Sequence, residues 1–367
     1  MNVSAQEREW LERDVWCLQG LPLDRVTLED CVEYCFKHFA SDQSRFVSTP
    51  NVKFLTSAQT DPEFLESVID SDLAFADGAP IVWLSRILGA NFPERVAGST
   101  LFEVLLNDAR PWSSFFFGGK DDAAKLACVN INASDSSCEC KGHLNPGVGS
   151  IDSMSVPVVI DELNEANANF MVVSLGAKKG QSWIIRNRKY LKCSIVCHLG
   201  AVVNFMAGTI ERAPVRWQKL GLEWLWRIKS EPTLKKRYMK DGLGLSKLIL
   251  TNILPLSIYQ CYLGLKIKSK DSKISTTVRS NRVIINVSGY LDWRARDALR
   301  AVLIQSLSSG KSIVIRCESI TYIDSAVLGS FVQMKRIMDQ RGKMLSFQAM
   351  PRRIHRLMEL NNIKGFL

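Results

Sequence analysis

The residues best suited to chemistry lie between positions 71 and 98. The apolar run 73–76 ends on Asp77-Gly78, and Arg95 follows a short distance along the chain. If the run is a buried strand, Asp77 stands at its carboxyl end, where ligands gather in open α/β sheets. A carboxylate there can take a proton from a substrate, and Arg95 can hold a phosphate or carboxylate. The alternative is structural: Asp77 caps the next helix and Arg95 is a surface cation.

Two further stretches could bind anions or metals. The run SFFFGG (114–119) ends in paired glycines, and a helix is predicted to begin near Asp121. This order can aim backbone N–H groups at a phosphate, so Gly118 and Gly119 are candidates, although a tight turn explains them equally well. Asp70-Ser71-Asp72 matches a metal-binding acidic triplet. Because it precedes the apolar strand, we expect it to be solvated surface instead.

Repeated strand–glycine–helix units must position these side chains. Strands are predicted at 46–55, 73–76, 114–119, 170–175 and 194–196, with helices between them. The first is broken by Pro50, so that Thr49 and Asn51 can turn toward a cleft. This alternation predicts an α/β fold with a Rossmann-like parallel sheet and helices on both faces.

A second, smaller α/β domain is predicted from residue 272. It has strands at 282–287, 312–316 and 344–347, and helices at 295–307, 324–341 and 351–360. The preceding stretch 243–265 is apolar but interrupted by Lys247, Asn252 and Pro255, which indicates a membrane-surface or interdomain segment and not a span. The expected domains are therefore 1–242, a linker or membrane-surface segment 243–271, and 272–367.

Composition limits the partners. The formal charge of +10 and pI near 9.1 favour a polyanion: nucleic acid, anionic lipid or a phosphorylated substrate. Ten cysteines without regular spacing indicate reduced thiols, and four histidines argue against a histidine metal centre, so we predict neither a metal nor a cofactor. The N-terminus lacks the apolar core of a signal peptide. We expect a cytoplasmic protein, peripheral to the membrane.

From about Trp16 to Asp241 the sequence resembles the WecG/TagA/CpsF group, glycosyltransferase family 26. The resemblance rests on eight motifs that occur in order: GLPLD (20–24), STPN (48–51), ADGAPIVW (76–83), PERVAG (93–98), LGA (199–201), NFMAG (204–208), RAP (212–214) and GLEWLWR (221–227).

The resemblance implies an inverting, metal-independent enzyme at the inner face of the cell membrane. Such enzymes move a sugar of the N-acetylmannosamine type, or a related hexose, from a UDP-sugar to an undecaprenyl-diphosphate-linked saccharide in cell-surface polysaccharide synthesis. It also implies roles for single residues. Asp77 is the general base, Thr49 and Asn51 are polar pocket residues, and Arg95 binds phosphate. The basic segment 212–237, with Arg212, Arg227 and Arg237, closes the site at the membrane.

One loop departs from the family's pattern. The family often has Pro-Lys-Gln-Glu after the Leu-Gly turn, whereas this chain has LGAKKGQSW from Leu175. Lys179 keeps the basic position, Gly180 stands where Gln is usual, and Gln181 stands where Glu is usual. We expect Lys179 and Gln181 to bind substrate, and we leave the donor sugar and the acceptor open.

Residues 272–367 resemble a STAS domain. The matching segments are SGYLD (288–292) and YIDSAVLGS (322–330). In phosphorylated members a serine follows the aspartate at this helix start, which corresponds to Ser325. Ala326 and Val327 replace the usual second serine and glycine. The resemblance implies a regulatory or binding module with a protein partner, and Ser325 as a regulatory position.

Two other functions compete with the transferase. The altered loop at 175–183 is compatible with a non-catalytic scaffold that binds a lipid-linked sugar and recruits partners through its STAS domain. The mixture of tryptophans and cations at 209–237 could stack nucleic-acid bases. Because no recognisable nucleic-acid motif accompanies that mixture, we predict no nucleic-acid partner.

Overall fold

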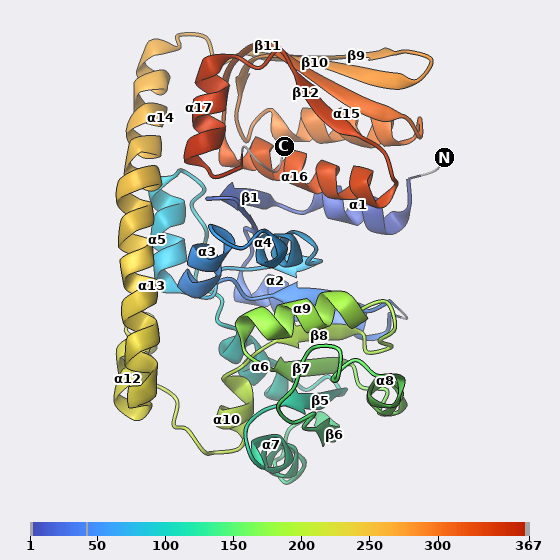
Figure 1. Cartoon of the computed structure of the whole chain (residues 1–367), viewed down its shortest axis with the longest axis vertical. Helices are drawn as coiled ribbons and strands as arrows, with labels where there is room; N and C mark the ends of the chain where they lie inside the picture. Colours follow the sequence, from blue (N-terminus) through green and yellow to red (C-terminus); the bar gives the residue numbers. More distant parts are fainter. Residues whose placement is uncertain (1–2, 42, 364–367) are drawn as a thin grey trace. The chain divides into compact units, whose positions relative to one another are not determined.

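The structure is a computed structural model that describes residues 3–41 and 43–363 (Figure 1). The chain divides into two compact units. One unit joins the N-terminal residues up to Arg25 with Trp83–Phe92 and with the chain from Gly244 onward. The other contains Val26–Val82 and Pro93–Leu243. Residues from both ends of the sequence therefore belong to one unit. The predicted domains differ, because each of them is a single continuous range of the chain.

The unit formed by Val26–Val82 and Pro93–Leu243 is built on six parallel strands, which confirms the predicted parallel sheet. The strand order is β4-β3-β8-β7-β5-β6. Four of these strands, β8, β7, β5 and β6, are labelled in Figure 1. Because all strands run in one direction, their carboxyl ends form a single edge. The strands are β3 (Arg45–Ser48), β4 (Leu73–Ala74), β5 (Trp112–Gly118), β6 (Cys138–Leu144), β7 (Phe170–Ser174) and β8 (Ile195–His198).

The central strands of this sheet are buried on both faces. Alternate residues of a strand point to opposite faces, and Phe116 belongs to one apolar cluster while Phe115 and Phe117 belong to the other. The helices and helical turns of this unit are α2 (Leu28–Phe39), α3 (Val52–Ala58), α4 (Pro62–Ile69), α6 (Gly98–Leu106), α7 (Ala123–Asn132), α8 (Pro157–Glu165), α9 (Ala177–Asn187), α10 (Val202–Met206), α11 (Val215–Lys219), α12 (Glu223–Ser230) and η1 (Pro232–Leu234).

Two local predictions are wrong. The predicted strand 46–55 is the strand β3 followed by the helix α3, because the Asn51 side chain accepts hydrogen bonds from the N–H groups of Lys53 and Phe54 and so caps a helix. The triplet 70–72 is not solvated surface. Ser71 and Asp72 are buried, and the Asp72 carboxylate accepts a hydrogen bond from Phe46 N at 2.8 Å and pairs with Arg188 at 2.9 Å.

The C-terminal residues form a four-stranded sheet in the order β12-β11-β10-β9, with β9 antiparallel and the others parallel. This confirms the second α/β domain and adds β9, which was not predicted. Its elements are β9 (Ser272–Val278), β10 (Arg282–Leu291), α15 (Arg296–Leu307), β11 (Ser312–Ile323), α16 (Ser325–Gln340), β12 (Leu345–Gln348) and α17 (Arg352–Leu360).

The N-terminal segment of the same unit, with α1 (Ala5–Glu12), β1 (Val15–Leu18) and β2 (Leu21–Asp24), lies along α16 (Figure 1). Glu7 accepts two hydrogen bonds from the Arg341 guanidinium, at 2.5 and 2.7 Å. Further along, the Arg336 guanidinium stacks 3.7 Å from the centre of the Trp10 ring. At Gly329 the backbones approach so closely that a Cβ atom would lie 2.3 Å from Val15 O.

Ser325 lies one helical turn before Gly329, on the same face of α16. Its side chain is 0% exposed, and its hydroxyl has no hydrogen-bond partner among the described residues. The expectation that a phosphate at Ser325 would alter a partner surface therefore does not fit this structure. The helix start itself is capped by Asp324, whose carboxylate accepts from the N–H groups of Ala326 and Val327.

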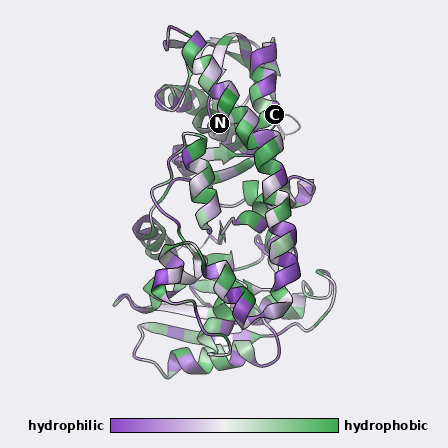
Figure 2. Cartoon of the chain, turned by 90° about the vertical axis from the view of Figure 1, so that its left-hand side faces the viewer, coloured by the Kyte–Doolittle hydropathy of each residue, from purple (hydrophilic) through white to green (hydrophobic). Residues whose placement is uncertain are grey.

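A long helical stretch leads into the C-terminal domain. It comprises α13 (Lys235–Leu248), η2 (Ile249–Ile253) and α14 (Leu254–Lys266). Among the described residues, Pro232–Lys266 is the one helix whose length and composition would allow it to cross a membrane. Figure 2 colours its residues by hydropathy, and the apolar ones divide between buried and exposed positions. The buried set is Leu248, Ile253, Leu256 and Leu263, and the exposed set is Leu243, Leu250, Leu254, Ile258, Tyr262 and Leu265.

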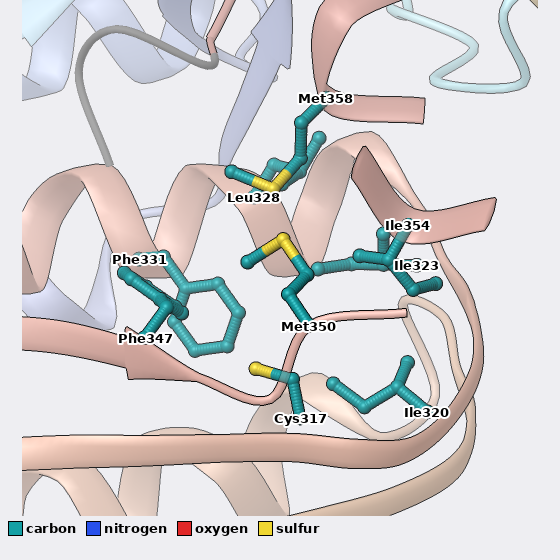
Figure 3. Close-up of a pocket in the computed structure, with 9 residues that line it drawn as sticks. All are labelled: Cys317, Ile320, Ile323, Leu328, Phe331, Phe347, Met350, Ile354 and Met358. Carbon is teal, nitrogen blue, oxygen red and sulfur yellow. The ribbon is translucent and has the colours of Figure 1, made fainter. Parts of the chain in front are cut away.

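The C-terminal domain contains a small cavity between its sheet, α16 and α17 (Figure 3). Every side chain that lines it is apolar or a thiol, so the cavity offers no charged group to hold a polar ligand. The lining residues are Cys317, Ile320, Ile323, Leu328, Phe331, Phe347, Met350, Ile354 and Met358. The candidate functional site lies instead in the other unit, at the carboxyl edge of its parallel sheet. Between Ala76 and Trp83 the chain there enters the helix α5 (Ala79–Ile87).

Candidate active site

Asp77 lies just beyond the carboxyl end of β4, at the ligand-facing edge that the sequence predicted. Its backbone N–H donates to Pro50 O at 2.8 Å, which ties the segment after β4 to the segment after β3. Its carboxylate accepts from Gly98 N, at the start of α6, at 3.4 Å. The side chain remains 23% exposed. Asp77 is thus fixed by backbone contacts on two sides while its carboxylate still reaches solvent.

Arg95 holds two carboxylates at once. Its Nη2 atom lies 3.6 Å from Asp77 Oδ1 and 2.6 Å from Glu223 Oε2. Burial raises the pKa of Asp77, the Arg95 charge opposes that rise, and the Glu223 charge adds to it. Arg95 therefore favours the ionised, proton-accepting form of Asp77.

Glu223 was not singled out from the sequence. It is the first residue of α12 and lies within the GLEWLWR motif, which could have marked it as a functional residue. The sequence gives no sign that Glu223 contacts Arg95, which lies 128 positions earlier. Its ion pair joins the basic segment 212–237 to the carboxyl edge of the sheet. Glu223 is thus a direct link between the basic segment and Arg95.

Thr49 and Asn51 flank Pro50, whose carbonyl oxygen accepts from Asp77 N, so both lie close to the Asp77 segment. A Cβ atom at Gly98 would fall 3.1 Å from Thr49 Cγ2 and 2.3 Å from Leu199 Cδ2, so Gly98 allows α6 to approach β3 and β8 closely. A Cβ atom at Gly78 would lie 3.8 Å from Asn51 Cβ. Thr49 is buried, and the Asn51 oxygen is used as the cap of α3. Neighbouring strand ends therefore bring the STPN and ADGAP motifs together.

The paired glycines are required for the turn after β5. Gly118 and Gly119 have φ values of +89° and +103°. A Cβ atom at Gly118 would lie 2.8 Å from Ser174 O, and the Gly119 N–H donates to that same oxygen at 3.1 Å. This N–H is therefore engaged with β7. If the turn binds a phosphate, it does so with other groups.

The two residues predicted from the altered loop have structural contacts. The Lys179 ammonium donates to Gly149 O at 2.5 Å, which ties α9 to the loop before α8. Gln181 is 0% exposed, and its amide donates to the Ser48 hydroxyl at 3.0 Å inside the protein. We therefore correct the expectation for Gln181 and leave it out of the substrate-binding residues, because a ligand could reach it only by opening the core.

The structure explains the glycine at position 180. A Cβ atom there would lie 2.4 Å from Cδ2 of His198, the last residue of β8, so the imidazole occupies the space of a side chain at 180. His198 is 8% exposed, and its Nε2 atom has no hydrogen-bond partner among the described residues. Burial and the Arg237 charge lower its pKa to about 4. The sequence analysis did not single out His198, because a lone histidine carries no motif.

The three arginines predicted from the basic segment, Arg212, Arg227 and Arg237, each have an acidic partner. Arg212 pairs with Glu103 and donates to Thr100 Oγ1 at 2.5 Å, so it is anchored on α6. Arg227 lies 3.3 Å from Glu231. Arg237 lies 3.8 Å from Asp241 and is half exposed. Of the three, Arg237 is the one whose charge acts on a strand-end residue of the sheet, His198.

No group of three His, Cys, Asp or Glu side chains that could hold a metal occurs within 3–41 and 43–363. Nine of the ten cysteines are buried and Cys261 is exposed, all as free thiols. At the carboxyl edge of the sheet Arg95 joins the carboxylates of Asp77 and Glu223, and the Arg237 charge acts on His198. One carboxylate with a neighbouring cation can remove a proton from a hydroxyl group, while further cations stabilise a departing anion.

Comparison with known proteins identifies the family. The model of the glycosyl transferase WecG/TagA/CpsF family matches residues 16–257, and the model described as Mlab, STAS domain matches residues 274–367. The chain is 24% identical, over 225 residues, to the N-acetylglucosaminyldiphosphoundecaprenol N-acetyl-beta-D-mannosaminyltransferase of Bacillus subtilis (strain 168). That match covers 60% of this chain and 86% of the relative.

Among solved structures, one described as "crystal structure of SsGBP and GDP complex" has a TM-score of 0.20 and 13% identity, and the match covers 70% of this chain and 98% of that chain. The family match spans most of the chain and includes all eight motifs and the site around Asp77. The chain therefore belongs to the glycosyl transferase WecG/TagA/CpsF family and is a glycosyltransferase that carries a STAS domain.

Proposed function

We propose that this glycosyltransferase moves a sugar of the N-acetylmannosamine type from a UDP-sugar to an undecaprenyl-diphosphate-linked saccharide, with inversion and without a metal. The observation that carries the proposal is the position of Asp77 beside Arg95 at the carboxyl edge of the sheet. The relative from Bacillus subtilis, whose name gives an N-acetylmannosaminyl group and a diphosphoundecaprenol acceptor, supports the substrate class.

In this mechanism Asp77 accepts the proton of the acceptor hydroxyl while the hydroxyl oxygen attacks the anomeric carbon of the donor. The bond from that carbon to the UDP oxygen breaks, and its electrons leave with UDP. One carboxylate is sufficient for such a single displacement. Because Asp77 must be ionised to accept the proton, the Arg95 charge supports the reaction by opposing the rise in the pKa of Asp77 that burial causes.

The departing UDP carries negative charge, which the basic segment can balance. Arg227 and Arg237 lie on α12 and α13, and Arg212 lies in the loop before α11. Arg95 contacts Asp77 directly. Electrostatic stabilisation of a leaving group by preset cations supplies a large share of catalysis in many enzymes. Thr49 and Asn51, which lie close to the Asp77 segment, are proposed to contact the sugars.

A transfer assay tests the proposal. Purified protein is incubated with UDP-sugars and a short-chain lipid diphosphate that carries N-acetylglucosamine, and the product's anomeric configuration is read by NMR. We expect Asp77→Asn to lower kcat by about 10²- to 10⁴-fold. Asp70→Asn, in the triplet that resembles a metal motif, is the matched control and should retain activity, as should wild type in EDTA. Wild-type activity in Asp77→Asn would remove the assigned base.

UDP-sugar binding without transfer to any acceptor would instead support the scaffold alternative. The same assay therefore separates the two functions, since binding is measured by calorimetry on the same preparation and transfer by product formation. Asp77→Asn should bind UDP as wild type does, because the carboxylate acts on the acceptor and not on the nucleotide.

Membrane association is proposed to use the exposed apolar face of the long helix. Leu250, Ile258 and Leu265 on this face are 67%, 70% and 84% exposed. The opposite face is packed within the unit, with Ile253 and Leu256 0% exposed, so we propose that the helix lies on the inner surface of the membrane and does not span it. Nearby cations such as Lys247 and Lys266 can meet lipid phosphates.

Regulation by the STAS domain is proposed to act within the chain. The helix α16 already holds the N-terminal segment through the Glu7–Arg341 and Trp10–Arg336 contacts. That segment includes β1 and β2, which lie inside the match to the glycosyltransferase family, and the chain continues directly from Arg25 into the other unit. A protein partner that competes for α16 would therefore release part of the transferase sequence.

A further inference from the structure

His198 is an unexplained polar group at the edge where the substrates are proposed to bind. It ends β8, between the strand that leads to Thr49 and the strand that leads to Gly176. More than nine-tenths of its side chain is buried, yet its Nε2 atom has no hydrogen-bond partner among residues 3–41 and 43–363. Buried polar atoms without a partner are rare in proteins and often mark a binding function.

The ring lies against the beginning of α9. A Cβ atom at Gly180, in the first turn of this helix, would be 3.4 Å from His198 Nε2, and one at Gly200 would be 3.6 Å from the same atom. The helix has eleven residues, and its N-cap, Gly176, provides no side-chain hydrogen bond. The first backbone N–H groups of α9 therefore have no side-chain cap, and the unpartnered imidazole nitrogen lies near Gly180, the last residue of this first turn.

The charge around this position favours an anion. A helix N-terminus carries partial positive charge, and its free N–H groups bind phosphate oxygens. The Arg237 guanidinium adds a full positive charge that acts on His198, and at neutral pH His198 is itself uncharged. A neutral imidazole can donate one hydrogen bond from Nε2 to an anionic oxygen without being a counter-ion.

We propose that His198 Nε2 and the first turn of α9 bind a phosphate of the diphosphate substrate. This proposal rests on the proposed function, because both the UDP-sugar and the lipid-linked acceptor contain a diphosphate. Gly180 contributes to the site by having no side chain, because a side chain there would displace the imidazole from the start of α9. His198 is thus a substrate-binding residue that neither a motif nor the family match identifies.

The test uses the full chain and two probes, UDP and a short-chain prenyl diphosphate, each titrated by calorimetry. His198→Leu removes the donor while keeping a side chain of moderate size, and His198→Gln restores an N–H at a similar distance along the side chain. A hydrogen bond to a charged group corresponds to about 10- to 100-fold in affinity. We expect His198→Leu to weaken one probe by that factor and His198→Gln to recover most of it. The probe affected shows whether the site takes the nucleotide or the lipid.

His38 provides a matched control. It is also a buried histidine of the same unit, but it lies near the end of α2 against Tyr34. His38→Leu should leave both affinities unchanged, and melting temperatures check that all variants are folded. The proposal is overturned if folded His198→Leu binds both probes like wild type, or if His198→Gln is folded and recovers nothing. If wild type binds neither probe, the proposed function and the role of His198 both fall; if wild type binds and folded His198→Leu binds equally well, only the role of His198 falls.

Discussion

The Glu223→Gln substitution tests the electrostatics of the site most directly. Glu223 and Asp77 contact the same Nη2 atom of Arg95, and the two distances, 2.6 and 3.6 Å, place their oxygens no more than about 6.2 Å apart. Two carboxylates at that separation repel by about 1 to 3 kcal/mol at an effective dielectric constant between about 20 and 40. Removing the Glu223 charge also leaves Asp77 as the carboxylate that pairs with Arg95. Both changes lower the pKa of Asp77.

The expected shift follows from these energies. One pKa unit corresponds to about 1.4 kcal/mol, and both Arg95 and Asp77 retain contact with solvent, which reduces the effect toward the lower limit. We therefore expect the pKa of Asp77 to fall by about one unit in Glu223→Gln. Arg95→Met should shift it upward, because the charge that opposes the effect of burial is lost.

The assay is the pH dependence of kcat/KM, whose acidic limb reports the essential base of the free enzyme. The limb should move to lower pH in Glu223→Gln and to higher pH in Arg95→Met. Glu231→Gln is the control, because Glu231 pairs with Arg227, whereas the carboxylate that raises the pKa of Asp77 is Glu223. An acidic limb that stays in place in both variants, or that moves in the opposite directions, would refute Asp77 as the base held by Arg95.

Three further predictions concern stability and location. Glu7→Arg or Arg341→Glu should increase hydrogen exchange in both 5–24 and α16, because each breaks the ion pair between the two segments. The double reversal should restore protection. Changes confined to the substituted segment would contradict a shared interface. His198 has a lowered pKa of about 4, so the native state binds fewer protons than the unfolded state between that value and about 6.5, and stability is lost as pH falls through this window. Denaturant unfolding of wild type should therefore lose about 2 kcal/mol more than His198→Leu between pH 6.5 and 5, and equal losses would show that the histidine is not buried neutral. Finally, Leu250→Glu with Ile258→Glu should reduce sedimentation with anionic vesicles at least tenfold while Leu126→Glu, an exposed leucine of α7, should not; unchanged sedimentation in the double variant would exclude this face.

Local sequence was sufficient for most of the parallel sheet. Apolar runs that end on glycine or aspartate identified β4, β5 and β7, because such runs are buried on both faces and must end where the chain turns. The exposed edge strands β6 and β9 were not predicted, since neither is a continuous apolar run. The helix α3 was read as strand because its cap, Asn51, follows a proline that breaks the apolar pattern.

The sequence by itself determined the family, the strand end that carries Asp77 and the cationic character of 212–237, because motifs and local patterns are properties of neighbouring residues. Only the tertiary structure decided which distant residues meet. Contacts between segments far apart in the chain form the Arg95–Glu223 pair and place the His198 imidazole against Gly180. Such contacts also bury Gln181 and Ser325. Burial and charge at such contacts set the pKa values of side chains and decide which polar groups remain free to bind a substrate. Both properties determine what the site can do chemically.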